Sequence, residues 1–120
     1  MTSILIVDDS AFARNNLRML VESAGHEIVG LAEDGEQALD LFKRLKPDLV
    51  LLDYLMEGKS GKEVLKEILQ HDSKAKVIMV SGLGDDTIEE KVLAAGAKIF
   101  VRKHHAQMNI SKIIDQVMKG

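Results

Sequence analysis

Five short apolar runs recur along the chain at nearly even spacing. Successive runs start 24, 21, 28 and 22 residues apart, at Ile4, Ile28, Leu49, Val77 and Ile99. The runs are continuously apolar rather than alternating, which is typical of strands covered on both faces. Each interval has room for one strand, one helix and two short loops. The pattern therefore predicts five strands, each separated from the next by a helix.

Apolar residues at helical spacing lie in the intervals and after the last run. The five predicted apolar faces are Leu17, Leu20, Val21 and Ala24; Ala38, Leu41 and Leu45; Val64, Leu65, Ile68 and Leu69; Ile88, Val92 and Ala95; and Ile110, Ile113, Ile114 and Val117. Ser10 can cap the first helix, Gly25 can end it, and Pro47 prevents the second from continuing. This alternation predicts an α/β domain with a parallel sheet, right-handed crossovers and helices on both faces.

Composition agrees with a single folded domain over residues 1–120. The chain has 46% hydrophobic and 29% charged residues, which is ordinary for a globular protein. It has no cysteine, which excludes a disulfide scaffold, a thiolate zinc site and a cysteine nucleophile. No apolar run approaches the ~20 residues of a membrane span, and no signal peptide is visible, so we expect a cytoplasmic protein without membrane insertion. The net charge of −3 gives no support for direct nucleic-acid binding.

Polar side chains follow four of the five apolar runs. Asp8 and Asp9 come directly after the first run, Asp53 after the third, Ser81 after the fourth and Lys103 after the fifth. Each alone has an ordinary explanation as a turn residue or a solvated charge. The carboxyl ends of parallel strands meet at one edge of the sheet, where α/β proteins bind their ligands. The five residues together therefore indicate a site.

The chemistry of these groups indicates phosphoryl transfer. Three neighbouring carboxylates repel one another unless a cation lies between them. Oxygen ligands without histidine or cysteine select Mg²⁺, with Mn²⁺ as an alternative. A lysine and a hydroxyl beside them would neutralise a phosphoryl group, and one carboxylate could be its nucleophile. Asp53 is the candidate nucleophile because it stands alone on a central strand, whereas Asp8 and Asp9 form the natural metal pair.

Four segments together resemble the receiver domains of response regulators in two-component signalling, and among these the stand-alone chemotaxis regulators. The segments are ILIVDDS at 4–10, KPDLVLLDYLM at 46–56, VIMVSG at 77–82 and AAGAKIFVRK at 94–103. The resemblance covers essentially the whole chain. It implies a flavodoxin-like (βα)5 fold, a doubly wound five-stranded parallel sheet in the order 2-1-3-4-5. It also implies a signalling phosphoacceptor that assists its own phosphorylation and dephosphorylation, rather than an enzyme.

Carried over residue by residue, the resemblance implies a metal site and a phosphoacceptor. Asp9 would bind Mg²⁺ directly, Asp8 mainly through water, and Leu55 through its backbone carbonyl. Asp53 would complete the metal site and accept the phosphoryl group. The donor would be the phosphohistidine of a sensor histidine kinase or of a phosphotransfer protein.

The resemblance also implies a switch of a protein-interaction surface. Ser81 and Lys103 would each contact a phosphate oxygen, and Phe100 would change rotamer as Ser81 moves. The chain ends soon after the fifth predicted helix, so we expect no output domain. The output would pass to an unidentified downstream protein effector or by onward phosphotransfer.

Two loops depart from the family pattern. The usual Met-Pro-x-Met-x-Gly after the phosphoacceptor reads MEGKSG at 56–61, and His104 follows Lys103 where a cis-proline is usual. We interpret His104 and His105 as part of a solvated loop. A cis bond before a residue other than proline costs about 2.5–4 kcal/mol. We therefore predict a trans Lys103–His104 bond, a retained lysine position and a reshaped start of the fifth helix, around Met108 to Ile110.

Other classes of protein fit the residues less well. A haloacid-dehalogenase-type phosphatase needs Asp-x-Asp after its first strand, whereas Ser10 stands two residues after Asp8. No P-loop sequence occurs in the chain. The open alternative is a pseudo-receiver, an interaction module that works without phosphorylation. The two departing loops allow this alternative, and the retained polar residues at the strand ends oppose it.

Overall fold

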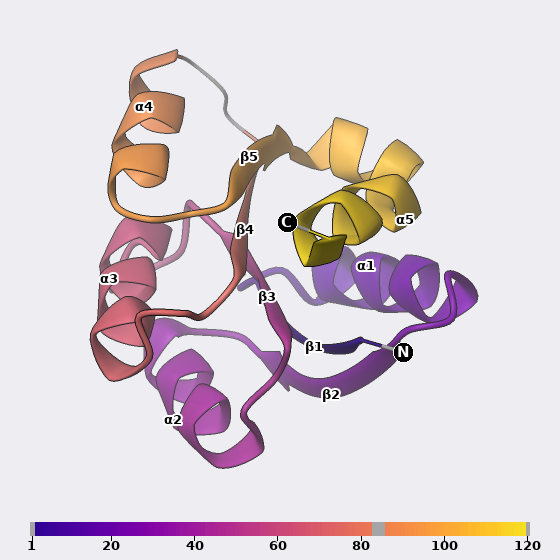
Figure 1. Ribbon diagram of the computed structural model, residues 1–120, viewed down its shortest axis with the longest axis horizontal. Coiled ribbons are helices and arrows are strands. Elements are labelled where there is room, and N and C mark those ends of the chain that lie inside the picture. The colour runs from indigo at the N-terminus through magenta and orange to yellow at the C-terminus, as the bar shows by residue number, and fades with distance from the viewer. Residues whose placement is uncertain (1, 83–85, 120) are drawn as a thin grey trace.

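The computed structural model describes residues 2–82 and 86–119, in which strands and helices alternate (Figure 1). The strands are β1 (Ser3–Val7), β2 (Glu27–Ala32), β3 (Leu49–Asp53), β4 (Val77–Ser81) and β5 (Ile99–Arg102). The helices are α1 (Ala11–Ser23), α2 (Gly35–Leu45), α3 (Gly61–His71), α4 (Asp86–Ala94) and α5 (Lys103–Lys119). Every strand begins within one residue of its predicted start. No helix in these two ranges is long and apolar enough to span a membrane.

The five strands form one parallel sheet in the order β2-β1-β3-β4-β5, which confirms the predicted fold class. β1 pairs with β3 so that Val7 lies opposite Leu52. β3 in turn pairs with β4 so that Asp53 lies opposite Val80. The carboxyl ends of β1 and β3 therefore lie side by side in the middle of the sheet. The strand order reverses at this point, which is where open α/β sheets bind ligands.

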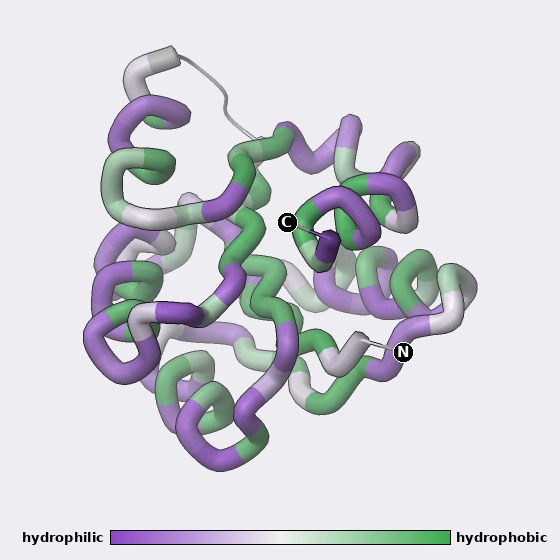
Figure 2. The backbone as a smooth tube through the Cα atoms, viewed as in Figure 1, coloured by the Kyte–Doolittle hydropathy of each residue, from purple (hydrophilic) through white to green (hydrophobic). Residues whose placement is uncertain are grey.

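Helices cover both faces of the sheet, with α1 and α5 on one face and α2, α3 and α4 on the other (Figure 1). Alternate residues of β1 face the two layers: Leu5 and Val7 pack toward α2, and Ile4 and Ile6 pack toward α1. All four are at most 1% exposed. Figure 2 shows the strands as a hydrophobic band through the middle of the molecule. Each Å² of apolar surface that is buried stabilises the folded state by about 25 cal/mol. Strands that are covered on both faces are therefore apolar on both faces.

Polar residues fix the start of three helices. Ser10, Asp34 and Ser60 each precede a helix, and each side chain accepts a hydrogen bond from the amide three residues later. Such N-caps stabilise a helix by about 1 kcal/mol. The predicted cap at Ser10 is confirmed, Gly25 follows the end of α1 with φ +88°, and Pro47 lies just beyond the end of α2.

The predicted apolar face of α2 is wrong at one position, whereas the other four faces are buried or half-buried. Leu45 is 39% exposed, and Phe42, outside the predicted face, is buried. Leu45 and Leu41 lie over Gly30 of β2, where an added Cβ would come within 3.0 Å and 3.6 Å of their Cδ1 atoms. Because β2 is an edge strand, it covers these leucines from one side only. Phe42 instead packs in the core between the sheet and the helices α2 and α3.

The chain enters α5 directly from β5, so the expectation of a solvated loop is wrong. α5 begins at Lys103 and includes both His104 and His105, which are exposed. Its backbone breaks at Asn109, whose φ of −133° and ψ of 20° are not helical. The described residues contain no cis peptide bond, so the predicted trans Lys103–His104 bond is confirmed. This break lies between Met108 and Ile110, where the sequence predicts a reshaped start of the fifth helix.

Candidate functional site

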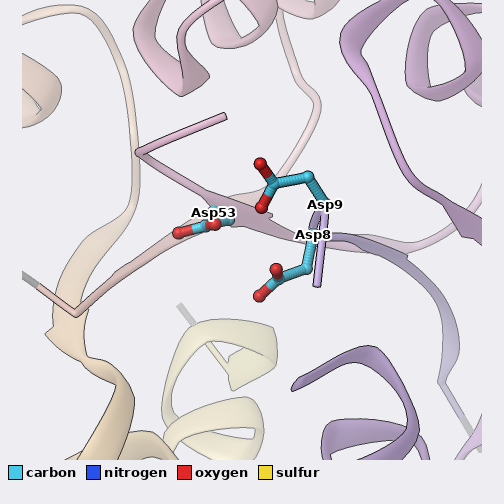
Figure 3. Close-up of side chains that lie close together, drawn as sticks. All are labelled: Asp8, Asp9 and Asp53. Carbon is cyan, nitrogen blue, oxygen red and sulfur yellow. The ribbon is translucent and has the colours of Figure 1, made fainter. Parts of the chain in front are cut away.

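Three carboxylates converge at the carboxyl ends of β1 and β3 (Figure 3). Asp8 and Asp9 directly follow β1, and Asp53 is the last residue of β3. One oxygen from each lies within 4.8 Å of one oxygen from each of the others. Asp8 and Asp53 are only 1% and 4% exposed, whereas Asp9 is exposed. The cluster thus has two members inside the protein and one at its surface.

Hydrogen bonds hold the Asp8 side of the cluster. The Asp8 amide donates to the Ala32 carbonyl at 3.0 Å, which continues the pairing of β1 with β2. The Ser10 amide donates to Asp8 Oδ1 at 2.9 Å. Arg14, in the first turn of α1, donates from Nη1 to the Asp8 carbonyl oxygen at 2.6 Å. Asp8 is therefore fixed through its amide, its carbonyl and its carboxylate.

A close approach at Gly61 holds the Asp53 side of the cluster. The Tyr54 amide donates to the Val80 carbonyl at 2.9 Å, and the Gly61 amide donates to the Tyr54 carbonyl at 2.8 Å. The start of α3 therefore lies directly against the end of β3. A Cβ at Gly61 would overlap the Asp53 carbonyl oxygen and would lie 2.7 Å from Tyr54 Cα. Among the ordinary residues, only glycine fits without a shift of the backbone.

Lys103 reaches the carboxylates from the first residue of α5. Its Nζ lies 2.9 Å from Asp8 Oδ2 and 3.6 Å from Asp53 Oδ2. Burial opposes the charged ammonium, but the hydrogen bond to Asp8 and the charge of Asp53 outweigh it, so the pKa of Lys103 is raised. The lysine therefore remains a cation beside the cluster.

The ionised form of Asp53 is unfavourable in this environment. Burial, and after it the negative charge of Asp8, raise the pKa of Asp53 to about 6. The charge of Lys103 and the backbone amide of Leu55 act in the opposite direction without compensating. A cation among the three carboxylates would favour the ionised form. The site therefore has the electrostatic character of a cation site.

Three further candidate residues lie around the cluster. Ser81 is the last residue of β4, the strand next to β3, and is fully buried. Leu55 follows Asp53 by two residues and is 48% exposed. Phe100 lies in β5 opposite Met79, half-buried against the apolar layer under α2, α3 and α4. The structure thus brings the three carboxylates together and places the Lys103 ammonium beside Asp8 and Asp53.

Two contacts near the carboxyl ends of these strands are not apparent from the sequence. Arg14 bonds a backbone carbonyl, an acceptor that almost any residue could provide, so no residue pair marks the contact in the sequence. Lys59, in the loop between β3 and α3, has its Nζ 2.8 Å from Glu67 Oε1. These two residues are eight positions apart, and one of them lies in a loop, so helical spacing does not reveal the pair.

Comparison with known proteins identifies the class. The chain matches the family described as the response regulator receiver domain over residues 4–115. It is 42% identical over 118 residues to protein CcdB of Bacillus subtilis, covering 98% of each chain. It is 36% identical over 116 residues to the chemotaxis protein CheY of Thermotoga maritima, covering 97% of each. A chain of the CheX–CheY–BeF3–Mg²⁺ complex from Borrelia burgdorferi matches with a TM-score of 0.86 and 32% identity, covering 94% of this chain and 89% of that one.

The chain belongs to the response regulator receiver domain family of two-component signalling. Receiver domains are signalling phosphoacceptors that use Mg²⁺ and interact with kinases and downstream effectors. The acidic cluster of Asp8, Asp9 and Asp53 could hold such an ion in this chain.

Proposed function

We propose that this protein accepts a phosphoryl group on Asp53 from the phosphohistidine of a sensor histidine kinase or of a phosphotransfer protein, and that the transfer requires Mg²⁺. Residues 1–120 act as one receiver domain, in which phosphorylation switches a surface that binds a downstream protein effector. The observation that carries the proposal is the convergence of three carboxylates and the Lys103 ammonium at one edge of the sheet.

The donor set fits Mg²⁺, with Mn²⁺ as the alternative. Asp8, Asp9 and Asp53 offer carboxylate oxygens within 4.8 Å of one another, and such hard oxygen ligands are those that Mg²⁺ prefers. Asp9 would bind directly and Asp8 mainly through water. Asp53 would add a carboxylate oxygen and Leu55 its backbone carbonyl. When bound, Mg²⁺ supplies positive charge that offsets the charge on the oxygens of the transferring group.

Asp53 is the nucleophile in this proposal. An oxygen of its ionised carboxylate attacks the phosphorus of the phosphohistidine, and the P–N bond breaks while the O–P bond forms. The imidazole nitrogen keeps the electron pair of the broken bond. The transition state is largely dissociative, so position and charge provide most of the catalysis. Lys103 would turn from Asp8 to one phosphate oxygen, and the Ser81 hydroxyl would donate to another.

The switch would pass through Ser81 and Phe100. Ser81 is fully buried, so its movement toward a phosphate oxygen would leave space inside the protein. Phe100 lies on the neighbouring strand β5 and is half-buried, so its ring can turn into that space. Phenylalanine has no hydroxyl, so packing alone would hold the inward position. The surface that changes would be the one formed by α4, β5 and α5.

Small phosphodonors test this proposal without knowledge of the kinase. Acetyl phosphate with Mg²⁺ should add one phosphoryl group, detected by the mass of the intact protein, and EDTA should prevent the addition. Asp53→Asn should abolish labelling, whereas Asp115→Asn, which changes an exposed carboxylate of α5, should not. Undiminished labelling of Asp53→Asn would refute the assignment. Failure of the wild type to respond to acetyl phosphate or beryllofluoride would favour the pseudo-receiver.

A further inference from the structure

We propose that Arg14 is a positioning residue of the metal site, which fixes the peptide group between Asp8 and Asp9 and thereby the direction of both carboxylates. This inference rests on the proposed Mg²⁺ site and adds to it a residue that does not itself contact the ion. Arg14 is half-buried in the first turn of α1, and its Nη1 donates to the Asp8 carbonyl oxygen at 2.6 Å.

The bonded carbonyl lies where it controls both carboxylates. It belongs to the planar peptide group that joins Asp8 to Asp9, so a rotation of this group changes the directions of the two side chains relative to each other. Before this group, the Asp8 amide is bonded to the Ala32 carbonyl at 3.0 Å. After it, the Ser10 amide is bonded to Asp8 Oδ1 at 2.9 Å. Arg14 holds the peptide group between these two fixed points.

The bond from Arg14 is suited to this task. A guanidinium donor is charged, and charge-assisted hydrogen bonds are roughly twice as strong as neutral ones. Leu17 and Val21 bury one face of α1 in the core, so the helix is a rigid base for the arginine. Mg²⁺ demands near-ideal octahedral geometry, so a small error in the direction of a carboxylate lowers the affinity.

Arg14 also brings a positive charge near the site, and this charge alone would oppose metal binding. The two effects differ in their dependence on salt, because salt screens charges but leaves geometry unchanged. At 0.5 M KCl the screening length is about 4 Å, so the effect of the charge is weakened while the orienting effect is not. Loss of the Arg14 bond should therefore weaken Mg²⁺ binding under this condition.

Three variants of the full chain separate orientation from charge and from general damage to α1. Arg14→Met keeps the aliphatic part of the side chain and removes every donor, whereas Arg14→Lys keeps the charge and loses the planar fork. Arg18→Met makes the same change one turn along the helix, at a half-buried arginine whose Nε has no hydrogen-bond partner among the described residues. Calorimetry, or the fluorescence of Tyr54, the single tyrosine, measures the affinity for Mg²⁺.

At 0.5 M KCl, Arg14→Met should raise the Kd for Mg²⁺ about tenfold, the lower end of the loss caused by removing a partner that orients a metal ligand. The Kd of Arg14→Lys should lie between those of the wild type and Arg14→Met. Arg18→Met should bind as the wild type does. A Kd of Arg14→Met equal to or below that of Arg18→Met would overturn the inference.

A second measurement needs no metal. The Asp9 amide belongs to the same peptide group as the Asp8 carbonyl, so its NMR resonance in metal-free protein should shift in Arg14→Met and stay in place in Arg18→Met. An unmoved resonance in Arg14→Met would refute the inference even if the wild type binds Mg²⁺. Failure of the wild type to bind Mg²⁺ would instead refute the proposed metal site, and with it the role of Arg14 in that site.

Discussion

The ammonium of Lys103 lies 2.9 Å from a carboxylate oxygen of Asp8 and 3.6 Å from one of Asp53. The lysine therefore lies closer to Asp8 than to Asp53, the candidate phosphoacceptor. In this arrangement it supplies part of the positive charge that the buried carboxylates require. A phosphoryl group on Asp53 would add negative charge on the other side of the ammonium. Lys103 would thus compete with a metal ion for Asp8 before phosphorylation and would pair with the phosphate afterwards.

Replacing Lys103 by alanine should therefore leave Mg²⁺ binding intact or strengthen it. The same variant should fail to reach the activated state with beryllofluoride, because no point charge remains to pair with the oxygens around Asp53. Calorimetric titration measures the first effect, and NMR spectra with and without beryllofluoride measure the second. Lys98→Ala, which changes an exposed lysine just before β5, is the control. A large loss of Mg²⁺ affinity in Lys103→Ala alone would contradict this division of roles.

Asp53 should make the metal-free protein less stable as the pH rises. Its pKa is about 6 in the folded protein, above the ordinary value of 3.8, so between these pH values the folded state binds more protons than the unfolded state. The free energy of unfolding must then decrease with rising pH across this window. The contribution of Asp53 to this decrease should be about 3 kcal/mol, and it should be complete above pH 7.

Urea unfolding in EDTA from pH 4 to pH 8 measures this effect. Asp53→Asn cannot titrate, so it should match the wild type near pH 4 and exceed its stability at pH 7. Mg²⁺ should restore stability to the wild type at pH 7, because it binds the ionised carboxylates of the folded state. Equal stabilities of the two metal-free proteins at pH 7 would show that the charge of Asp53 is not unfavourable.

Gly61 is the position at which a single added methyl group should damage the site. It would overlap the Asp53 carbonyl oxygen and lie 2.7 Å from Tyr54 Cα, two backbone atoms that cannot move aside independently. Gly61→Ala should lower the free energy of unfolding by about 2 kcal/mol, as overpacking does, and should weaken Mg²⁺ binding by displacing Asp53. Gly82→Ala is the matched control, since its Cβ would meet, among the residues that the structure describes, only Lys103 Cδ, at 4.0 Å. Superimposable urea curves of the two variants would count against the close approach.

Lys59 lies in the loop after β3, which departs from the family pattern. It stands where that pattern has its second methionine. Its aliphatic carbons lie against Gly35 at the start of α2, where an added Cβ would be 3.1 Å from Lys59 Cβ. Its ammonium extends to Glu67 Oε1 on α3, at 2.8 Å. The side chain therefore packs through its aliphatic carbons and forms an ion pair through its ammonium.

Lys59→Met should consequently keep most of the stability, whereas Lys59→Ala should be less stable because it also removes the packed carbons. The ion pair itself should contribute little to stability, since its side chains are 37% and 30% exposed. A double-mutant cycle with Glu67→Gln measures this coupling. The Arg44–Asp40 pair, with 62% and 64% exposure, is the control and should give a smaller value. Equal losses in Lys59→Met and Lys59→Ala would show that the packing is unimportant.

The strands and the acidic cluster could be predicted because their physical requirements leave marks in the sequence. A strand between two helical layers must be apolar on both faces, so β1 and β3 appear as continuous runs. Parallel pairing then places the residues after these runs at the same edge. The sequence alone therefore predicts that Asp8, Asp9 and Asp53 are neighbours, and that Lys103, after β5, lies near them.

Features set by tertiary contacts left no comparable mark. Periodicity gives α2 an apolar face, but the position of β2 at the sheet edge decides that Phe42 is buried and Leu45 is half-covered. Nothing in the local sequence signals that α5 begins directly at Lys103, or that its backbone breaks at Asn109. The contact of Arg14 with a main-chain carbonyl depends on where α1 lies relative to β1. Such details require the packed structure.

The three phenylalanines of the chain make the proposed switch directly observable. Phe100 is half-buried in β5. Phe42 belongs to α2, is buried, and packs edge-on against His71, with ring centroids 6.1 Å apart. Phe12 is 81% exposed on α1. Fluorine-labelled phenylalanine should therefore give three NMR signals in different environments, which single Phe→Leu variants assign.

Beryllofluoride with Mg²⁺ should shift the Phe100 signal, because Ser81 would move toward the ligand on Asp53 and the ring would turn into the vacated space. The Phe42 signal should stay in place and serve as the internal control, since its ring packs against the far end of α3. Ser81→Ala removes the hydroxyl that the ligand attracts, so the Phe100 shift should be lost although Asp53 still binds beryllofluoride. A shifted Asp53 amide with an unmoved Phe100 signal in the wild type would mean that the ligand binds without turning the ring. Activation would then have to reach α4 and α5 without the buried serine and the phenylalanine, and the two-state packing change proposed for this face would be wrong.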